Sequence, residues 1–152
     1  MFSNINMVIR RLEQRVTGKE RARQKVQISV NTTEAEIAGA QQQRLLLQQH
    51  LVSLVMAGET SLEAILENKA HQGSLQRRLA EIDLMLADKR QQLEQLTQQR
   101  DVLKSERNRL QRKADKMTDH LRRCRQQQEH GRQRRHEAET EELRNWQISL
   151  PQ

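Results

Sequence analysis

Aromatic and other apolar side chains are scarce in this sequence. Of its 152 residues only 34% are hydrophobic, and its aromatic residues are one Phe, one Trp and no Tyr. So few large apolar side chains argue against a globular core of ordinary size. The 31% of charged residues and the mean hydropathy of −0.98 leave two possibilities, a disordered chain or a long helix that needs only a narrow apolar seam.

Cysteine is almost absent as well, since Cys124 is the only one and no internal disulfide can form. We expect Cys124 to be a small apolar filler rather than a nucleophile. The histidines are scattered along the sequence, at His50, His71, His120, His130 and His136. They predict no metal-ligand cluster, and we expect neither a cofactor nor a small-molecule substrate.

Long apolar runs are missing too. No run approaches the roughly 20 residues of a membrane-spanning helix. The first residues, MFSNINMVIRRLEQR, lack the apolar stretch of about 7–15 residues found in signal peptides. We therefore expect a cytoplasmic protein, although the basic segment MVIRRLEQRVTGKERAR (7–23) would also suit a helix on a membrane surface.

What the sequence does contain is a heptad pattern, with apolar residues at alternating steps of four and three. From Ile5 to Leu54 these steps give 15 positions, 11 of them apolar, and from Leu75 to Cys124 they give 15, 12 of them apolar. The pattern predicts an all-α fold, a long antiparallel two-helix coiled-coil hairpin with a longer C-terminal helix. We expect one elongated domain, 1–152, with helices at about 5–57 and 61–147 and a turn at about 58–60.

The turn has its own signals in AGETSLE (57–63). Gly58 can take the left-handed conformation that ends a helix, and Thr60 with Glu63 matches the capping box of a new helix. Because the connection is short, the helices should pair residues whose numbers sum to about 118.

That pairing leaves the second helix without a partner beyond about residue 115. In this overhang we expect three seam residues to be exposed without a partner helix in the chain: Met117, Leu121 and Cys124. Bare apolar stripes usually mark a binding surface or an oligomer seam.

The segment just after the turn has an ambiguous phase. Residues 61–72 either form a short separate helix with a kink at Gly73-Ser74, or belong to one helix that tolerates a glycine at about 1 kcal/mol. Their apolar residues either contact a partner or cover the end of the first helix. These residues are Leu62, Ile65 and Leu66.

Charge is unevenly distributed along the chain. Residues 1–30 carry a net +5, 31–103 carry −3, 104–135 carry +8 and 136–152 carry −3. Antiparallel pairing would bring the two basic segments together at one end of the hairpin. That end is either an Arg-rich solvated face or a surface that docks on acidic groups. The many arginines favour docking, because a guanidinium group forms paired hydrogen bonds with a carboxylate or a phosphate. The candidate contacts are Arg10, Arg11, Arg15, Arg122, Arg123 and Arg125.

Enzymatic motifs and nucleic-acid motifs are both hard to find. The sequence has no phosphate loop, H-E-x-x-H pair or G-x-S-x-G elbow, and we expect Glu137, Glu141 and Glu142 to be solvated or to contact a partner.

Nucleic acid is an alternative partner for the basic end. Phe2 and Trp146 are too few for base stacking, and the basic residues do not form a separate region before a zipper. A self-associating coiled-coil scaffold is the third alternative.

These features together resemble one family. The chain is similar to the stalk proteins of type III secretion systems, which are the virulence-injectisome counterparts of the flagellar export stalk protein. The closest segments are SLEAILENKAHQGSLQRRLAEIDLMLADKRQQLEQL (61–96) and GRQRRHEAETEEL (131–143). The resemblance covers nearly the whole chain.

The resemblance implies a non-enzymatic stalk, similar to the gamma subunit of rotary ATP synthases. The paired terminal helices would enter a hexameric secretion ATPase and stimulate it, which makes the six arginines the candidate ATPase-binding residues. The tip, with Leu62, Ile65 and Leu66, would face the export gate. The resemblance also implies binding of secretion chaperones and a cytoplasmic place at the periphery of the inner-membrane export apparatus.

Overall fold

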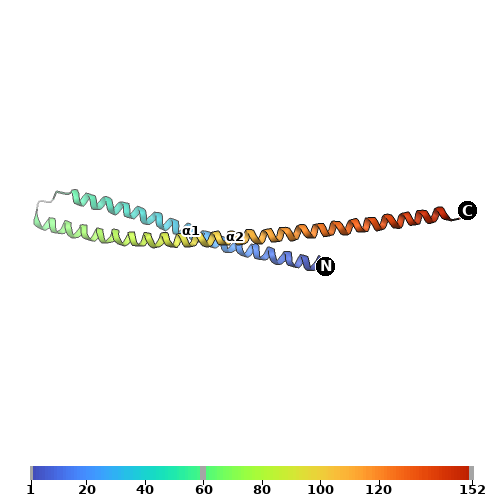
Figure 1. Cartoon of the computed structure of the whole chain (residues 1–152). Coiled ribbons are helices and arrows are strands. Elements are labelled where there is room, and N and C mark those ends of the chain that lie inside the picture. The colour runs from blue at the N-terminus through green and yellow to red at the C-terminus, as the bar shows by residue number, and fades with distance from the viewer. Residues whose placement is uncertain (1, 59–60, 151–152) are drawn as a thin grey trace. The chain divides into compact units, whose positions relative to one another are not determined.

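The computed structural model describes residues 2–58 and 61–150 and contains two α-helices. Helix α1 spans Phe2–Met56 and helix α2 spans Leu62–Ser149, with lengths of 55 and 88 residues (Figure 1). The described residues contain no strand. The predicted all-α class and the hairpin with its longer C-terminal helix are therefore confirmed. Both helices are rich in Gln, Leu, Arg, Glu and Ala, residues with high helix propensity.

The chain divides into two compact units, each built from a part of both helices. The terminal unit contains Met1–Lys19 and Ser105–Gln152, and the central unit contains Glu20–Lys104. In the central unit, the later part of α1 and the first part of α2 run side by side in opposite directions (Figure 1). Each unit buries its own short row of apolar side chains.

The central unit has a thin apolar core between its helices. Ile37, Ala40 and Leu86 are buried together, and Ile82 and Leu93 pack against them. Ile37 and Ala40 are three residues apart, and the α2 residues are separated by four and seven. This is the heptad spacing that the sequence predicted.

The terminal unit has a core of its own, and it corrects one prediction. Ile9, Ala114 and Leu121 are buried there, with at most 8% of each residue exposed. Met117 and Cys124 are half-buried. The expectation that Met117, Leu121 and Cys124 lie bare in an overhang is therefore wrong.

The unpaired stretch of α2 begins later than expected. In α2, residues 125–149 are all exposed apart from the half-buried Gly131. Residues 125–149 carry few apolar side chains, so the apolar seam of α2 ends where α2 no longer pairs with α1.

The helix register explains this correction. Lys19 Nζ lies 2.6 Å from Glu106 Oε2, and Lys89 Nζ lies 2.6 Å from Glu36 Oε2. The numbers of such partners sum to about 126 rather than 118. Each residue of α1 therefore faces a residue of α2 that is about two helical turns closer to the C-terminus than predicted.

The offset starts at the turn itself. Asn68 Nδ2 donates a 3.1 Å hydrogen bond to the carbonyl oxygen of Leu54, which is one of the free carbonyls at the end of α1. The end of α1 thus lies level with Asn68, more than a turn inside α2. The first turn of α2 consequently extends past the end of α1.

The helix ends differ from their predicted caps. No described glycine has a positive φ, so Gly58 does not end α1 in the left-handed conformation as predicted. Thr60 lies outside the described residues. Instead, Ser61 Oγ accepts a 3.1 Å hydrogen bond from the backbone N–H of Ala64, which makes Ser61 the N-cap. The residue three positions after Ser61 is Ala64, whose side chain cannot accept a hydrogen bond from the backbone N–H of Ser61. The second hydrogen bond of a capping box is therefore missing at Ser61.

Helix α2 is continuous through Gly73 and Ser74, so residues 62–72 are not a separate helix. A Cβ added to Gly73 would meet no atom within 4 Å. This glycine therefore has no conformational or packing role in the helix.

We expect Gly73→Ala to raise the free energy of unfolding by about 0.5–1 kcal/mol, because alanine loses less backbone entropy on folding. Urea unfolding followed by circular dichroism at 222 nm measures the change. Gly39→Ala, also in a helix with open space around the added carbon, is the matched control. A loss of stability for Gly73→Ala alone would instead indicate a kink that requires glycine.

Neither helix contains, in its described residues, a segment apolar enough to span a membrane.

Candidate functional site

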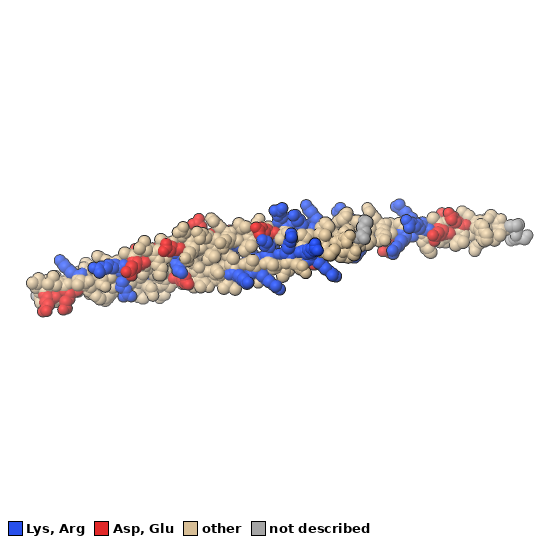
Figure 2. Space-filling model, turned by 90° about the horizontal axis from the view of Figure 1, so that it is seen from below, with Lys and Arg blue, Asp and Glu red and all other residues tan. Residues whose placement is uncertain are grey.

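The terminal unit carries the whole net charge of the chain. Its residues 1–19 and 105–152 hold 16 basic and 9 acidic groups, whereas the central unit, 20–104, holds 11 of each. The net charge of +7 therefore belongs to the terminal unit alone. In Figure 2 Lys and Arg side chains crowd the paired helices that lead up to the N-terminal end of α1. Such a concentration of one sign attracts acidic partners.

The six arginines predicted as contacts all lie in this unit, and all are exposed. Lys19 pairs with Glu106, so Arg10 lies level with about residue 116 of α2. At 1.5 Å per residue, Arg10 is then about 10 Å from Arg122 along the helix axis. The two arginine triplets therefore lie at neighbouring levels of the terminal unit, and we call the six together the arginine surface.

Most of these arginines have no carboxylate partner within the described part of the chain. Arg122 Nη2 lies 3.2 Å from Asp119 Oδ1, and the other five make no ion pair there. The central unit contrasts with this. Arg23 donates hydrogen bonds of 3.1 and 2.6 Å to both Glu20 oxygens, and this bonding raises the pKa of Arg23 above its ordinary value. Cations with no internal partner remain free to bind one from outside.

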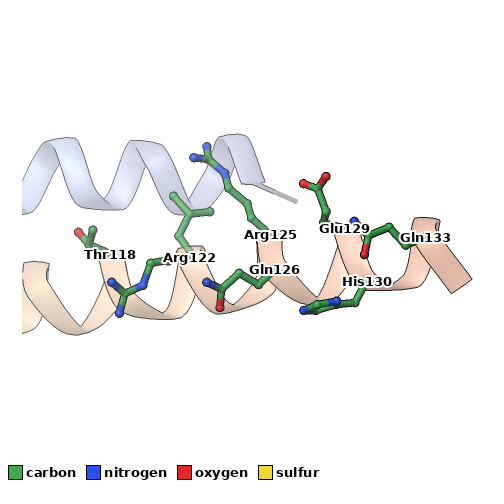
Figure 3. A pocket seen from close by; sticks show the side chains of 8 residues that line it. Thr118, Arg122, Arg125, Gln126, Glu129, His130 and Gln133 are labelled. Carbon is green, nitrogen blue, oxygen red and sulfur yellow. The ribbon is translucent and has the colours of Figure 1, made fainter.

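A shallow groove lies on α2 where the N-terminal end of α1 stops covering it. Its lining consists of Thr118, Leu121, Arg122, Arg125, Gln126, Glu129, His130 and Gln133. Figure 3 shows Arg125 reaching toward the end of α1, while Arg122 and His130 point to the other side of α2. The groove is open, and its exposed wall is mostly the carbon parts of these side chains, which carry charged or amide groups at their ends. Such an open groove suits the side chains of another protein rather than an enclosed small molecule. Sequence reasoning found the two arginines and missed the polar residues after Arg125.

The turn end of the central unit exposes an apolar surface. The three residues predicted from the sequence, Leu62, Ile65 and Leu66, are 73%, 38% and 60% exposed. The end of α1 adds three more large side chains that sequence reasoning missed: Val52, Val55 and Met56, exposed by 60%, 61% and 80%. We call these six residues the tip surface.

The alternative for the tip residues is that they fold back over Leu51, Leu54 and Val55 at the end of α1. Leu51 and Leu54 are half-buried, and Val55 is 61% exposed. At the start of α2 the exposure follows from the register offset, because the first turn of α2 extends past the end of α1. Exposed apolar residues grouped in this way usually mark a contact with another protein.

Two histidines that look unrelated in sequence meet across the hairpin. His50 Nε2 of α1 lies 3.2 Å from His71 Nε2 of α2, and the two rings are edge to face with centroids 5.4 Å apart. Elsewhere, Cys124 Sγ lies 3.6 Å from His120 Nε2 one turn earlier on α2. Among the described residues, no group of three or more His, Cys, Asp or Glu side chains is placed to hold a metal ion.

Comparison with known proteins identifies one family. The family described as Salmonella surface presentation of antigen gene type M protein matches residues 3–144, nearly the whole chain. No curated protein and no solved structure matches the sequence.

Proposed function

Because the chain belongs to the family of the Salmonella surface presentation of antigen gene type M protein, which is a family of type III secretion proteins, we propose that it is a non-enzymatic stalk of the export apparatus. In this role the terminal unit inserts into the hexameric secretion ATPase and stimulates it. The tip surface contacts the export gate. The protein then works in the cytoplasm, at the periphery of the inner-membrane export apparatus.

The observation that carries this proposal is the distribution of charge. The central unit is neutral, and the terminal unit holds the whole net charge of +7. Five of its six candidate arginines make no ion pair within the described part of the chain. Like charges on neighbouring turns cost a few tenths of a kcal/mol per pair, and an acidic partner removes that cost. A ring lined with carboxylates would provide such a partner.

Secretion chaperones are a further class of partner in this proposal. The last turns of α2 carry Leu143, Trp146 and Ile148, which are 63%, 65% and 76% exposed. They follow the acidic stretch with Glu137 and Glu141. This end of α2 differs in charge and polarity from the arginine surface, so it can bind a different protein.

The direct test mixes the purified chain with its cognate secretion ATPase and measures the hydrolysis rate against the concentration of the chain. We expect saturable stimulation, with a half-maximal concentration that rises as sodium chloride increases from about 50 to 300 mM, because salt screens the arginines. Binding to duplex DNA or RNA is measured alongside by fluorescence anisotropy. Absent stimulation together with tight nucleic-acid binding would replace the stalk by the nucleic-acid alternative.

A further inference from the structure

The His50–His71 pair has the geometry of two metal ligands. In a tetrahedral zinc site each Zn–N bond is 2.0–2.1 Å, so two ligating nitrogens lie about 3.4 Å apart. The two Nε2 atoms are 3.2 Å apart, and they come from different helices, 21 residues apart in sequence. Their separation is thus close to the edge of a zinc tetrahedron without movement of the backbone.

The chemical state of the rings also suits a metal. A neutral imidazole ring offers one nitrogen lone pair, and this is the form of histidine that binds metal ions. In the metal-free chain only one ring can donate a hydrogen bond to the other. An ion between the rings would instead use the lone pairs of both Nε2 atoms. Both side chains are exposed, so water can fill the remaining positions.

We propose that His50 and His71 form a binding site for a divalent transition-metal ion of the zinc type. Imidazole ligands select zinc and its transition-metal neighbours over magnesium and calcium, which prefer oxygen. The ion clips α1 to α2 near the turn. Because the site needs the folded hairpin, binding stabilises the fold, independently of the proposed stalk function.

The test uses the full chain without a histidine tag, carrying Cys124→Ser so that the His120–Cys124 pair cannot bind metal. After treatment with a chelator, the melting temperature is measured against free zinc chloride. Above the dissociation constant, we expect a rise of about 3–5 °C for each tenfold increase in zinc, and reversal by EDTA. Calorimetric titration should give one ion per chain, and magnesium chloride should change nothing.

Two variants decide the assignment. In the same background, His50→Gln and His71→Gln should each remove the zinc-dependent rise, and each should melt within about 1 °C of the parent without metal, since both side chains are exposed. His136→Gln, which changes an exposed histidine elsewhere on α2, should keep the full response. If the rise persists in both pair variants, or if neither heat nor stabilisation occurs at 1 mM zinc, the site does not exist.

Discussion

Reversing Arg122, Arg123 and Arg125 to glutamate should strongly weaken stimulation of the secretion ATPase. The half-maximal concentration of the chain should rise at least tenfold, which corresponds to about 1.4 kcal/mol of binding free energy. The three side chains are exposed in the unit that holds the net positive charge, and two of them line the groove beside the end of α1. Glutamates there would repel the acidic partner that the arginines attract. Hydrolysis of ATP at low salt measures the effect.

Folding should survive this change. The reversal removes one exposed ion pair, between Arg122 and Asp119, and such a pair contributes at most about 1 kcal/mol. The matched control reverses Arg77, Arg78 and Arg90, which are exposed in the central unit and give the same change in net charge. Stimulation should persist in this control. Equal loss in both triple variants would show that net charge alone matters, and loss of nucleic-acid binding with intact stimulation would contradict the proposed docking surface.

Much of the fold was predictable because heptad spacing reports directly on which face of a helix is buried. Ile37, Ala40 and Leu86 were all predicted seam residues, and all are buried. The register was not predictable to the same degree. It depends on how the last carbonyls of α1 are satisfied, and a side chain from the second turn of α2, Asn68, bonds the Leu54 carbonyl. The seam pattern repeats every seven residues, so it tolerates this offset.

The candidate sites also differ in whether they depend on the register of the two helices. The arginine surface was visible in the sequence, because charge counts do not depend on register. The His50–His71 pair was missed because two residues 21 positions apart meet only in one particular register. Half of the tip surface was missed because the prediction considered only the residues after the turn. Val52 and Val55 lie beside the seam positions of α1 rather than on them, and they are 60% and 61% exposed.

Truncating the tip should stop secretion without unfolding the protein. We expect Leu62→Ala with Leu66→Ala to reduce secreted substrate at least tenfold in cells whose only copy of this protein is the variant. The two side chains are 73% and 60% exposed, so their removal loses little buried area in the free chain. In the proposed role these leucines contact the export gate, and their truncation removes apolar area from that contact. Substrate in the culture supernatant is measured by immunoblotting.

The stability of the purified variant separates contact from folding. Its melting temperature should stay within about 4 °C of the parent, since each truncation of an exposed leucine changes stability by about 0.5 kcal/mol or less. Leu45→Ala with Leu84→Ala is the matched control, because these leucines are 54% and 71% exposed in the same unit but lie away from the turn. This control should secrete normally. A drop of many degrees in the tip variant would mean that Leu62 and Leu66 support the hairpin itself, and normal secretion by a stable tip variant would remove the export gate from the partners of this surface.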